Sequence, residues 1–207
     1  MKSFTDFLTE GRSNVLHAFD MDETLVAHDP KHLKVHIRDA RGKLLKSLTN
    51  QEFNKYKLKP GEHYDFKDFR SANVLAKSAH PIQPMINRLN RLKRRGFKTE
   101  IVTARSDLDD KQKVRKILKK FGVDIKTTHM RRAGNIEGTS TGDRKRKVIS
   151  DLIKKHRYKE VHLYDDDVGN HTHFAKLKQD HPGVRLVSHI VRHNERTKRT
   201  NTVTIRH

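Results

Sequence analysis

The sequence lacks cysteine and tryptophan altogether, and it has no long apolar run. Without cysteine the chain can form neither disulfide bonds nor thiolate metal sites, which agrees with a reducing compartment such as the cytoplasm. Its longest apolar stretches, such as SNVLHAF and TEIVTA, are far shorter than the roughly 20 residues that cross a bilayer. No apolar signal-peptide core follows the start. We therefore expect a cytoplasmic protein that has no membrane partner.

Acidic residues are also scarce, since 25 Asp and Glu oppose 46 Lys and Arg and leave a formal net charge of +21. Such an excess attracts polyanions, namely nucleic acid, an anionic membrane or an acidic protein. Aromatic residues make up only 6% of the chain, which argues against base stacking and favours phosphate contacts without sequence recognition. We predict nucleic acid as a partner of this basic surface, with solubility alone as the alternative role of the charge.

The length of 207 residues suits one domain with a small inserted module. Apolar residues amount to 33%, below the usual value of about 45–50%, but they are concentrated in periodic runs. The expected strands are 15–19, 99–102, 123–128, 160–164 and 184–191. The expected helices are 81–95, 108–121, one that includes 148–153, and 172–178. Strands that alternate with helices predict an α/β fold, in which a parallel sheet has helices on both faces.

Residues 28–75 interrupt this alternation and are predicted to form a small insertion. Two alternating runs flank Arg41 and Gly42, which is a hairpin signal, and a short helix is expected to follow. The aromatics of EFNKYKL and YDFKDF can give the insertion a core of its own. The domain is predicted to span residues 11–192. Residues 193–207 predict a basic tail, which either stays outside the sheet or adds an edge strand to it.

Polar residues gather where the expected strands end. They follow three of the strands, and a lysine opens the helix before the last of these: Asp20, Asp22, Thr103, Lys145, Asp165, Asp166 and Asp167. The carboxyl ends of parallel strands form the crevice where ligands bind in such sheets. Clustered carboxylates repel one another unless a cation neutralises them, and oxygen-only ligands suit Mg²⁺ together with a substrate phosphate. We therefore predict a magnesium site in this crevice.

The order of these residues resembles four motifs of the haloacid dehalogenase (HAD) superfamily of phosphohydrolases. The motifs are Asp-Met-Asp-Glu-Thr, a threonine at a strand end, a lysine and an Asp-Asp pair. The resemblance covers about residues 15–191 apart from the insertion, whose position is similar to that of a cap. It implies a three-layer, Rossmann-like fold and Mg²⁺-dependent hydrolysis of a phosphomonoester.

The resemblance also implies roles for the acids. Asp20 would attack phosphorus and become an aspartyl phosphate, and Asp22 would protonate the leaving oxygen and then activate water. The metal ion would be held by the Asp20 carboxylate, the Asp22 backbone carbonyl, and Asp165 or Asp166.

Further residues are implied as phosphate ligands. Thr24 would order the loop, Thr103 would bind a phosphate oxygen, and Lys145 would neutralise shared negative charge. Lys147 is the alternative to Lys145, because the helix register is open to more than one choice. Arg105 is either a surface arginine or a phosphate contact, since polynucleotide 3′-phosphatases of this superfamily are similar at that position.

The first ten residues, MKSFTDFLTE, have helical apolar spacing and a capping-box signal at Ser3 and Asp6. The segment predicts either a short helix packed on the domain or a processed peptide. It resembles the capsid-targeting peptides of internal head proteins in T-even-like tailed phages, which are cut after Leu-x-Glu or Ile-x-Glu. That resemblance implies a mature chain that begins at Gly11, a phage capsid or scaffold as partner, and a place inside the virion.

Three functions are therefore open. The first is a phosphatase that acts on nucleotides or polynucleotide phosphate ends. The second is a basic, DNA-associated internal virion protein with a HAD fold that works by binding. The third is a phosphatase of small metabolites whose positive charge is incidental. The second acid, Asp22, favours phosphoryl transfer over a role in binding alone.

Overall fold

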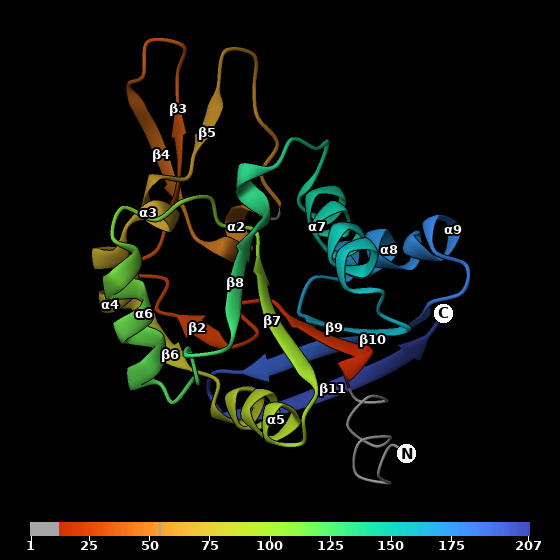
Figure 1. Ribbon diagram of the computed structural model, residues 1–207. Helices are drawn as coiled ribbons and strands as arrows, with labels where there is room; N and C mark the ends of the chain where they lie inside the picture. Colours follow the sequence, from red (N-terminus) through yellow and green to blue (C-terminus); the bar gives the residue numbers. More distant parts are fainter. Residues whose placement is uncertain (1–12, 54) are drawn as a thin grey trace, which may run out of the picture.

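The computed structural model of the protein describes residues 13–53 and 55–207 (Figure 1). The targeting peptide predicted at residues 1–10 lies outside the described residues. In the described part of the chain, no helix combines the length and the apolar character that crossing a membrane requires.

The centre of the molecule is a mostly parallel sheet flanked by helices (Figure 1), which confirms the α/β class predicted from the sequence. The strand order is β11-β10-β9-β1-β7-β8, and all neighbours are parallel except β10 and β11. The strands are β1 (Val15–Phe19), β7 (Lys98–Thr103), β8 (His129–Arg132), β9 (Glu160–Asp165), β10 (Arg185–Asn194) and β11 (Arg199–Arg206).

Alternation along the strands creates two cores. Leu16 and Ala18 of β1 pack into one apolar cluster, whereas Phe19 packs into the other, because successive side chains of a strand point to opposite faces. One cluster is covered by α5 (Gln83–Arg94) and α6 (Lys111–Lys120). The other is covered by α7 (Thr141–His156), α8 (Val168–Ala175) and α9 (Leu177–Asp180).

Two elements differ from the sequence predictions, and one open alternative is decided. The strand expected at 123–128 lies further along the chain as β8, because Val123 is buried and its amide closes the end of α6 on the Leu118 carbonyl at 3.0 Å. The helix expected at 172–178 is split between α8 and α9. The basic tail adds the edge strand β11, which pairs with β10 in antiparallel fashion.

The segment between β2 (Val26–His28) and β6 (Ala79–Pro81), called the insert below, forms a second small sheet in the order β4-β3-β5 at the top of Figure 1. Its elements are β3 (Val35–Arg38), β4 (Leu44–Leu48), α2 (Asn50–Phe53), β5 (His63–Asp65), α3 (Lys67–Arg70) and α4 (Ala72–Ser78). Val35, Ile37 and Leu48 pack with aromatic residues into a separate core, which confirms that prediction. The β2–β6 pairing was missed, because two three-residue strands leave no periodic signal.

A stack of imidazole rings crosses β1, β9 and β10. The His17 and His162 rings stack with centroids 4.3 Å apart, and His162 Nδ1 lies 2.9 Å from His189 Nε2. Burial, together with the neighbouring His162, lowers the pKa of His17 to about 3 and that of His189 to about 4. Both rings are therefore neutral in the folded protein near pH 7.

Acidification is expected to destabilise the fold through this stack. An unfolded histidine takes up a proton near pH 6.5 whereas buried His17 does so near pH 3, so the unfolded state binds more protons between these values. Stability is therefore complete above about pH 6.5 and falls as the pH drops below it, by about 2 kcal/mol for His17 at about pH 5. In urea unfolding from pH 7.5 to 5, the His17→Phe variant should lose correspondingly less stability than the wild type.

The control is His32→Gln, because the His32 ring is half exposed. This variant should show the same dependence of stability on pH as the wild type. A His17→Phe variant with the full wild-type loss on acidification would contradict the assignment.

Candidate active site

The site lies where the carboxyl ends of three neighbouring strands meet. Asp20 follows β1, Thr103 ends β7 and Asp165 ends β9. Parallel pairing aligns Phe19 with Tyr164, and the Asp20 amide donates to the Tyr164 carbonyl at 2.8 Å. The register of β1 and β9 therefore sets Asp20 beside Asp165, as the sequence predicted for parallel neighbours.

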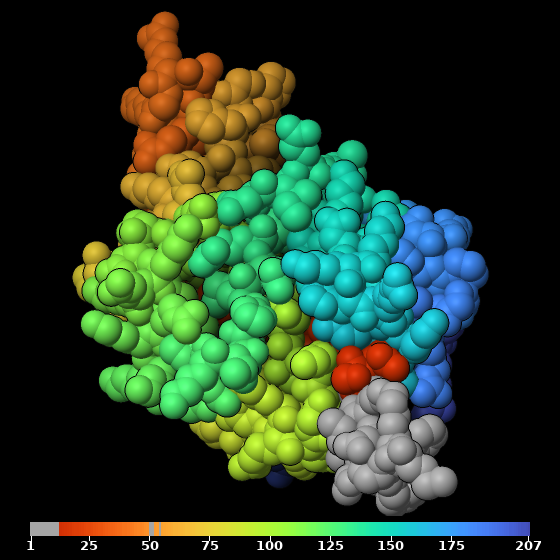
Figure 2. Space-filling model, viewed as in Figure 1, coloured from red at the N-terminus to blue at the C-terminus, as the bar shows by residue number. Residues whose placement is uncertain are grey.

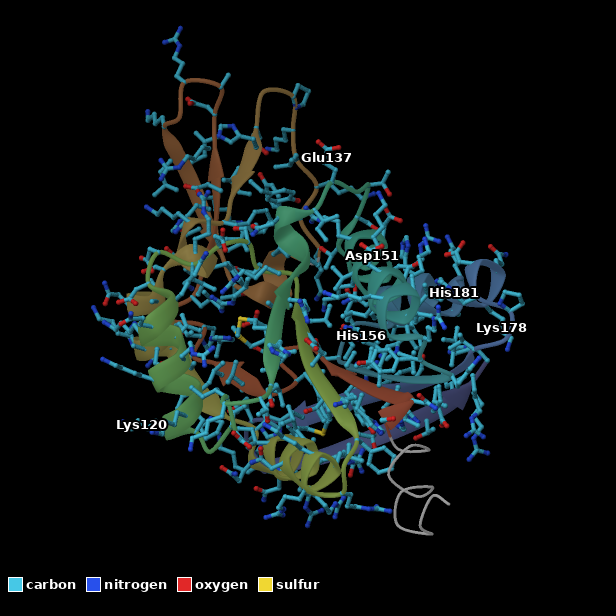
Figure 3. All side chains as sticks on the ribbon, in the orientation of Figure 1. Lys120, Glu137, Asp151, His156, Lys178 and His181 are labelled. Carbon is cyan, nitrogen blue, oxygen red and sulfur yellow. The ribbon has the colours of Figure 1, made fainter. Side chains whose placement is uncertain are left out.

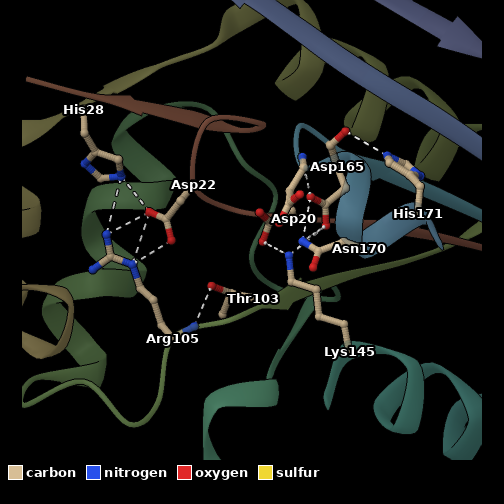
Figure 4. A network of polar contacts seen from close by, with 10 residues as sticks. Asp20, Asp22, His28, Thr103, Arg105, Lys145, Asp165, Asn170 and His171 are labelled. Carbon is tan, nitrogen blue, oxygen red and sulfur yellow. Dashed lines mark hydrogen bonds and ion pairs between the residues drawn. The ribbon is translucent and has the colours of Figure 1, made fainter. Parts of the chain in front are cut away.

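Lys145 joins these two carboxylates. Its Nζ lies 2.9 Å from Asp20 Oδ1 and 2.7 Å from Asp165 Oδ2 (Figure 4), and the side chain is almost completely buried. Burial alone would lower the pKa of Lys145, but the two carboxylates outweigh burial and raise it, so the ammonium stays charged.

The helix register that sequence reasoning left open is set by a cap. Ser140 accepts a hydrogen bond from the Asp143 amide at 3.1 Å and starts α7 there. Lys145 then faces the sheet. Lys147 instead projects outward, where its Nζ donates to the Glu137 carbonyl at 2.9 Å. Lys145 and not Lys147 therefore reaches the carboxylates.

Asp166 adds a third carboxylate to the two that Lys145 contacts. Oxygens of Asp20, Asp165 and Asp166 all lie within 4.8 Å of one another, and this triad could hold a metal ion. Burial raises the pKa of Asp20 well above its usual value, and burial together with Asp165 raises that of Asp166 to about 8. One lysine cannot neutralise three acids, so a cation would relieve the remaining repulsion.

Two residues that sequence reasoning missed fix the position of Asp165. Asn170 Nδ2 donates to both carboxylate oxygens at 3.0 and 3.1 Å, and His171 Nε2 donates to the Asp165 carbonyl at 3.0 Å. Both lie in α8, which Asp167 caps by accepting from the Gly169 amide at 2.8 Å. An Asp before a helix is a sequence signal for a helix cap, so the start of α8 at Asp167 could have been predicted. The contacts of Asn170 and His171 with Asp165 could not be predicted from that signal.

Asp22 lies outside this triad, in a second polar cluster of the same crevice (Figure 4). The Arg105 guanidinium binds both of its oxygens, with Nε to Oδ2 at 2.9 Å and Nη2 to Oδ1 at 2.8 Å. His28 Nε2 contacts Oδ1 at 2.6 Å, and Ser78 Oγ lies 3.0 Å from His28 Nδ1. His28 ends β2 just before the insert and Ser78 is the last residue of α4 and of the insert, so both junctions of the insert contribute to this cluster.

These contacts decide the ionisation of Asp22. Burial alone would raise the pKa of Asp22, but the Arg105 charge and the hydrogen bond with His28 outweigh it and hold the pKa far below its usual value. Asp22 is therefore a carboxylate in this state. A carboxylate can accept a proton from water, whereas donating a proton would first require the loss of Arg105.

Arg105 is not the surface arginine that was one of the two alternatives. Its side chain is almost completely buried, Nη1 donates to the Phe69 carbonyl at 2.7 Å, and its guanidinium lies 5.2 Å from the centre of the Phe69 ring. The Arg105 amide donates to Thr103 Oγ1 at 3.2 Å, and Thr103 lies between the two polar clusters in Figure 4.

Two predicted contacts have no counterpart in the described structure. Thr24 is fully buried, and its Oγ1 has no hydrogen-bond partner among the described residues. It lies in the turn after Asp22, where Glu23 adopts a left-handed conformation with φ 55°. Phosphate binding by Thr24 and metal binding by the Asp22 carbonyl therefore stay predictions.

No protein-family model matches the chain, and a search of the curated proteins finds no significantly similar sequence.

The loop that carries Arg105 is expected to depend on Gly134. A Cβ added at Gly134 would lie 2.6 Å from the Arg105 carbonyl carbon and 2.5 Å from the Ser106 amide. Both are backbone atoms, so Gly134→Ala must displace the loop and should cost about 1–3 kcal/mol in urea unfolding. Gly183→Ala is the control, because a Cβ there meets nothing within 4 Å. Equal stability of the two variants would contradict the packing argument.

Mg²⁺ is expected to stabilise the protein through the triad. Saturating Mg²⁺ should raise the melting temperature by several degrees, since a ligand at about 100 times its Kd adds about 2.7 kcal/mol. Each variant is compared with and without metal. Asp166→Asn should lose most of the shift, whereas Asp151→Asn, an exposed change on α7, should retain it. A full shift in Asp166→Asn would count against this metal site.

Proposed function

We propose that the protein is a Mg²⁺-dependent phosphomonoester hydrolase of the HAD superfamily, with a Rossmann-like domain and the insert as its cap. One observation carries the proposal: Lys145 bridges Asp20 and Asp165 at the strand ends, while Asp22 lies in a separate cluster with Arg105. This arrangement combines a nucleophile, a cation-binding triad and a separate proton carrier, which phosphoryl transfer through an aspartyl phosphate requires.

The oxygen-only triad fits Mg²⁺, which takes one or two carboxylates together with substrate phosphate. The bound ion would neutralise charge on the phosphate and favour the ionised form of Asp20. The Asp20 carboxylate, the Asp22 backbone carbonyl, and Asp165 or Asp166 would hold it.

In the first step an Asp20 oxygen attacks phosphorus, the bond to the leaving oxygen breaks, and an aspartyl phosphate forms. Lys145 neutralises charge that Asp20 shares with the transferring group, and Thr103 offers its hydroxyl to a phosphate oxygen. In the second step Asp22 removes a proton from the attacking water. Phosphate leaves and Asp20 is restored.

Arg105 connects substrate binding to the protonation of Asp22. Its Nε and Nη2 donors are engaged by Asp22 and its Nη1 by the Phe69 carbonyl. A substrate phosphate competes with Asp22 for this guanidinium. Transfer of Arg105 to the phosphate frees Asp22 to take up a proton, which it then donates to the leaving oxygen.

The net charge of +21 supports nucleotides or polynucleotide phosphate ends as the substrate class over small metabolites. The same charge favours a second candidate function, that of a DNA-associated internal virion protein. A panel of 3′- and 5′-phosphorylated oligonucleotides, nucleotides and sugar phosphates separates the three functions. A nucleotide or polynucleotide phosphatase hydrolyses the oligonucleotides or nucleotides, a metabolite phosphatase hydrolyses the sugar phosphates, and a binding protein leaves every member intact.

Asp20→Asn is expected to lower Mg²⁺-dependent phosphate release by at least about 10³-fold, because an amide oxygen cannot replace the nucleophile. The substrate is a small generic phosphomonoester, and release is measured as inorganic phosphate. Asp107→Asn, an exposed change, is the matched control. Circular dichroism checks that each variant is folded.

Full activity of Asp20→Asn would refute the mechanism. A wild-type protein that hydrolyses no member of the panel but binds DNA would favour the virion function instead.

A further inference from the structure

A concave site lies at the opposite end of the sheet from the carboxylates. It is a groove of about 510 Å³ whose lining includes Lys93, Phe97, Lys98, His129, Arg131 and His156. These residues come from the beginnings of β7 and β8 and from the ends of α5 and α7. In Figure 2 the yellow-green, blue-green and cyan segments meet on the face turned toward the reader. We call this site the basal groove.

The basal groove is remote from the catalytic crevice. Lys98 begins β7 and Thr103 ends it, and six strand residues at about 3.3 Å each span roughly 17 Å. The basal groove is therefore separate from the triad and from the cluster around Asp22. The proposed phosphatase mechanism uses none of its residues.

The basal groove is lined by residues of three segments that are rich in positive charge, namely 91–98, 124–131 and 154–159, and Lys93, Lys98 and Arg131 are its basic lining residues. The three segments contain a single acidic residue, Asp124. Their basic residues are Arg91, Lys93, Arg94, Arg95, Lys98, Lys126, Arg131, Lys154, Lys155, Arg157 and Lys159. A concave surface with charges of one sign concentrates the potential and attracts ions of the opposite sign.

The acids near the basal groove are already paired. Lys93 Nζ lies 2.8 Å from Asp124 Oδ2, and Arg131 Nε lies 2.9 Å from an oxygen of the buried Glu100. Lys98 is exposed and forms no ion pair with any residue of the described ranges. The charge that remains for a ligand is therefore positive.

Helix dipoles do not account for these residues. Lysines and arginines in the last turns of α5 and α7 complement the negative helix ends. Lys98 and Lys126, however, lie on a strand and in a loop, and Lys159 lies beyond the end of α7. The positive charge extends past the region in which a helix end acts.

We propose that the basal groove binds the phosphodiester backbone of nucleic acid as an anchoring site distinct from the catalytic crevice. The exposed large apolar residues of the described chain are Leu44, Leu45, Leu58, Phe66, Val168, Val203 and Ile205, and none belongs to the three segments. Insertion into a lipid surface is therefore disfavoured.

The phenylalanine and tyrosine rings of the basal groove are engaged in the protein. Phe97 packs edge-on against His17 at 5.1 Å and lies under the Arg95 guanidinium at 5.6 Å, and Tyr158 is buried. Neither Phe97 nor Tyr158 therefore offers a free face for stacked bases. The groove therefore contacts phosphates and does not read sequence.

The test compares two variants that each remove three lysines. The groove variant changes one exposed lysine in each segment, Lys98→Gln, Lys126→Gln and Lys155→Gln. The control changes Lys116→Gln, Lys119→Gln and Lys120→Gln on the exposed face of α6. Figure 3 labels His156 and Lys120, which lie on separate parts of the molecule.

Binding of a fluorescent single-stranded DNA with hydroxyl ends is measured by anisotropy from ~50 to ~200 mM salt. The probe has no phosphomonoester, so binding is independent of hydrolysis. The groove variant should bind at least about 10-fold more weakly, and its slope of log Kobs against log salt should fall by about 2, since each lost phosphate contact on a single strand accounts for about 0.7. The control should change by less than about 2-fold.

Equal losses in both variants would overturn the proposal in favour of a diffuse charge effect, and unchanged binding in the groove variant would also overturn it. Release of phosphate from a small phosphomonoester should be the same in the groove variant as in the wild type. Failure of the anchoring site is thereby distinguished from failure of the proposed phosphatase.

Discussion

The buried contact of Lys145 with Asp20 and Asp165 is the interaction on which the rest of the site depends. An ammonium and two carboxylates removed from water are costly unless each finds its partner. That requirement constrains three elements at once. β1 and β9 must be parallel neighbours in one register, and α7 must be capped by Ser140 so that its second turn faces the sheet. A shift of one residue in any of them would leave a charge buried without its partner.

Charge is distributed unevenly over the molecule, and the fold explains how this is possible. The net charge is +21, yet carboxylates gather at the carboxyl ends of the strands. Lysines and arginines gather around the amino ends of β7 and β8. The length of a strand separates the two regions, so the negative crevice can be built without being neutralised by the basic surface, and the basic surface keeps its attraction for polyanions.

Much of the architecture was predictable because local patterns report burial. The strands around Leu16, Ile101 and Leu163 were identified by their apolar runs, and turn and cap residues marked the helix ends. Errors occurred where a tertiary contact overrides the local pattern. Val123 looks like a strand residue but closes a helix, and the β2–β6 pair is held by partners far apart in the chain.

For the candidate site, the sequence by itself determined which residue types stand at the strand ends and in what order. That order suffices to predict a crevice lined by Asp20, Asp22, Thr103 and Asp165. Only the tertiary structure decided how they are grouped. It separated Asp22 from the triad, chose Lys145 over Lys147, buried Arg105, and brought in Asn170, His171 and His28. The reason is physical: periodicity specifies the face on which a side chain lies, whereas pairing of buried charges depends on distances set by the register of neighbouring elements.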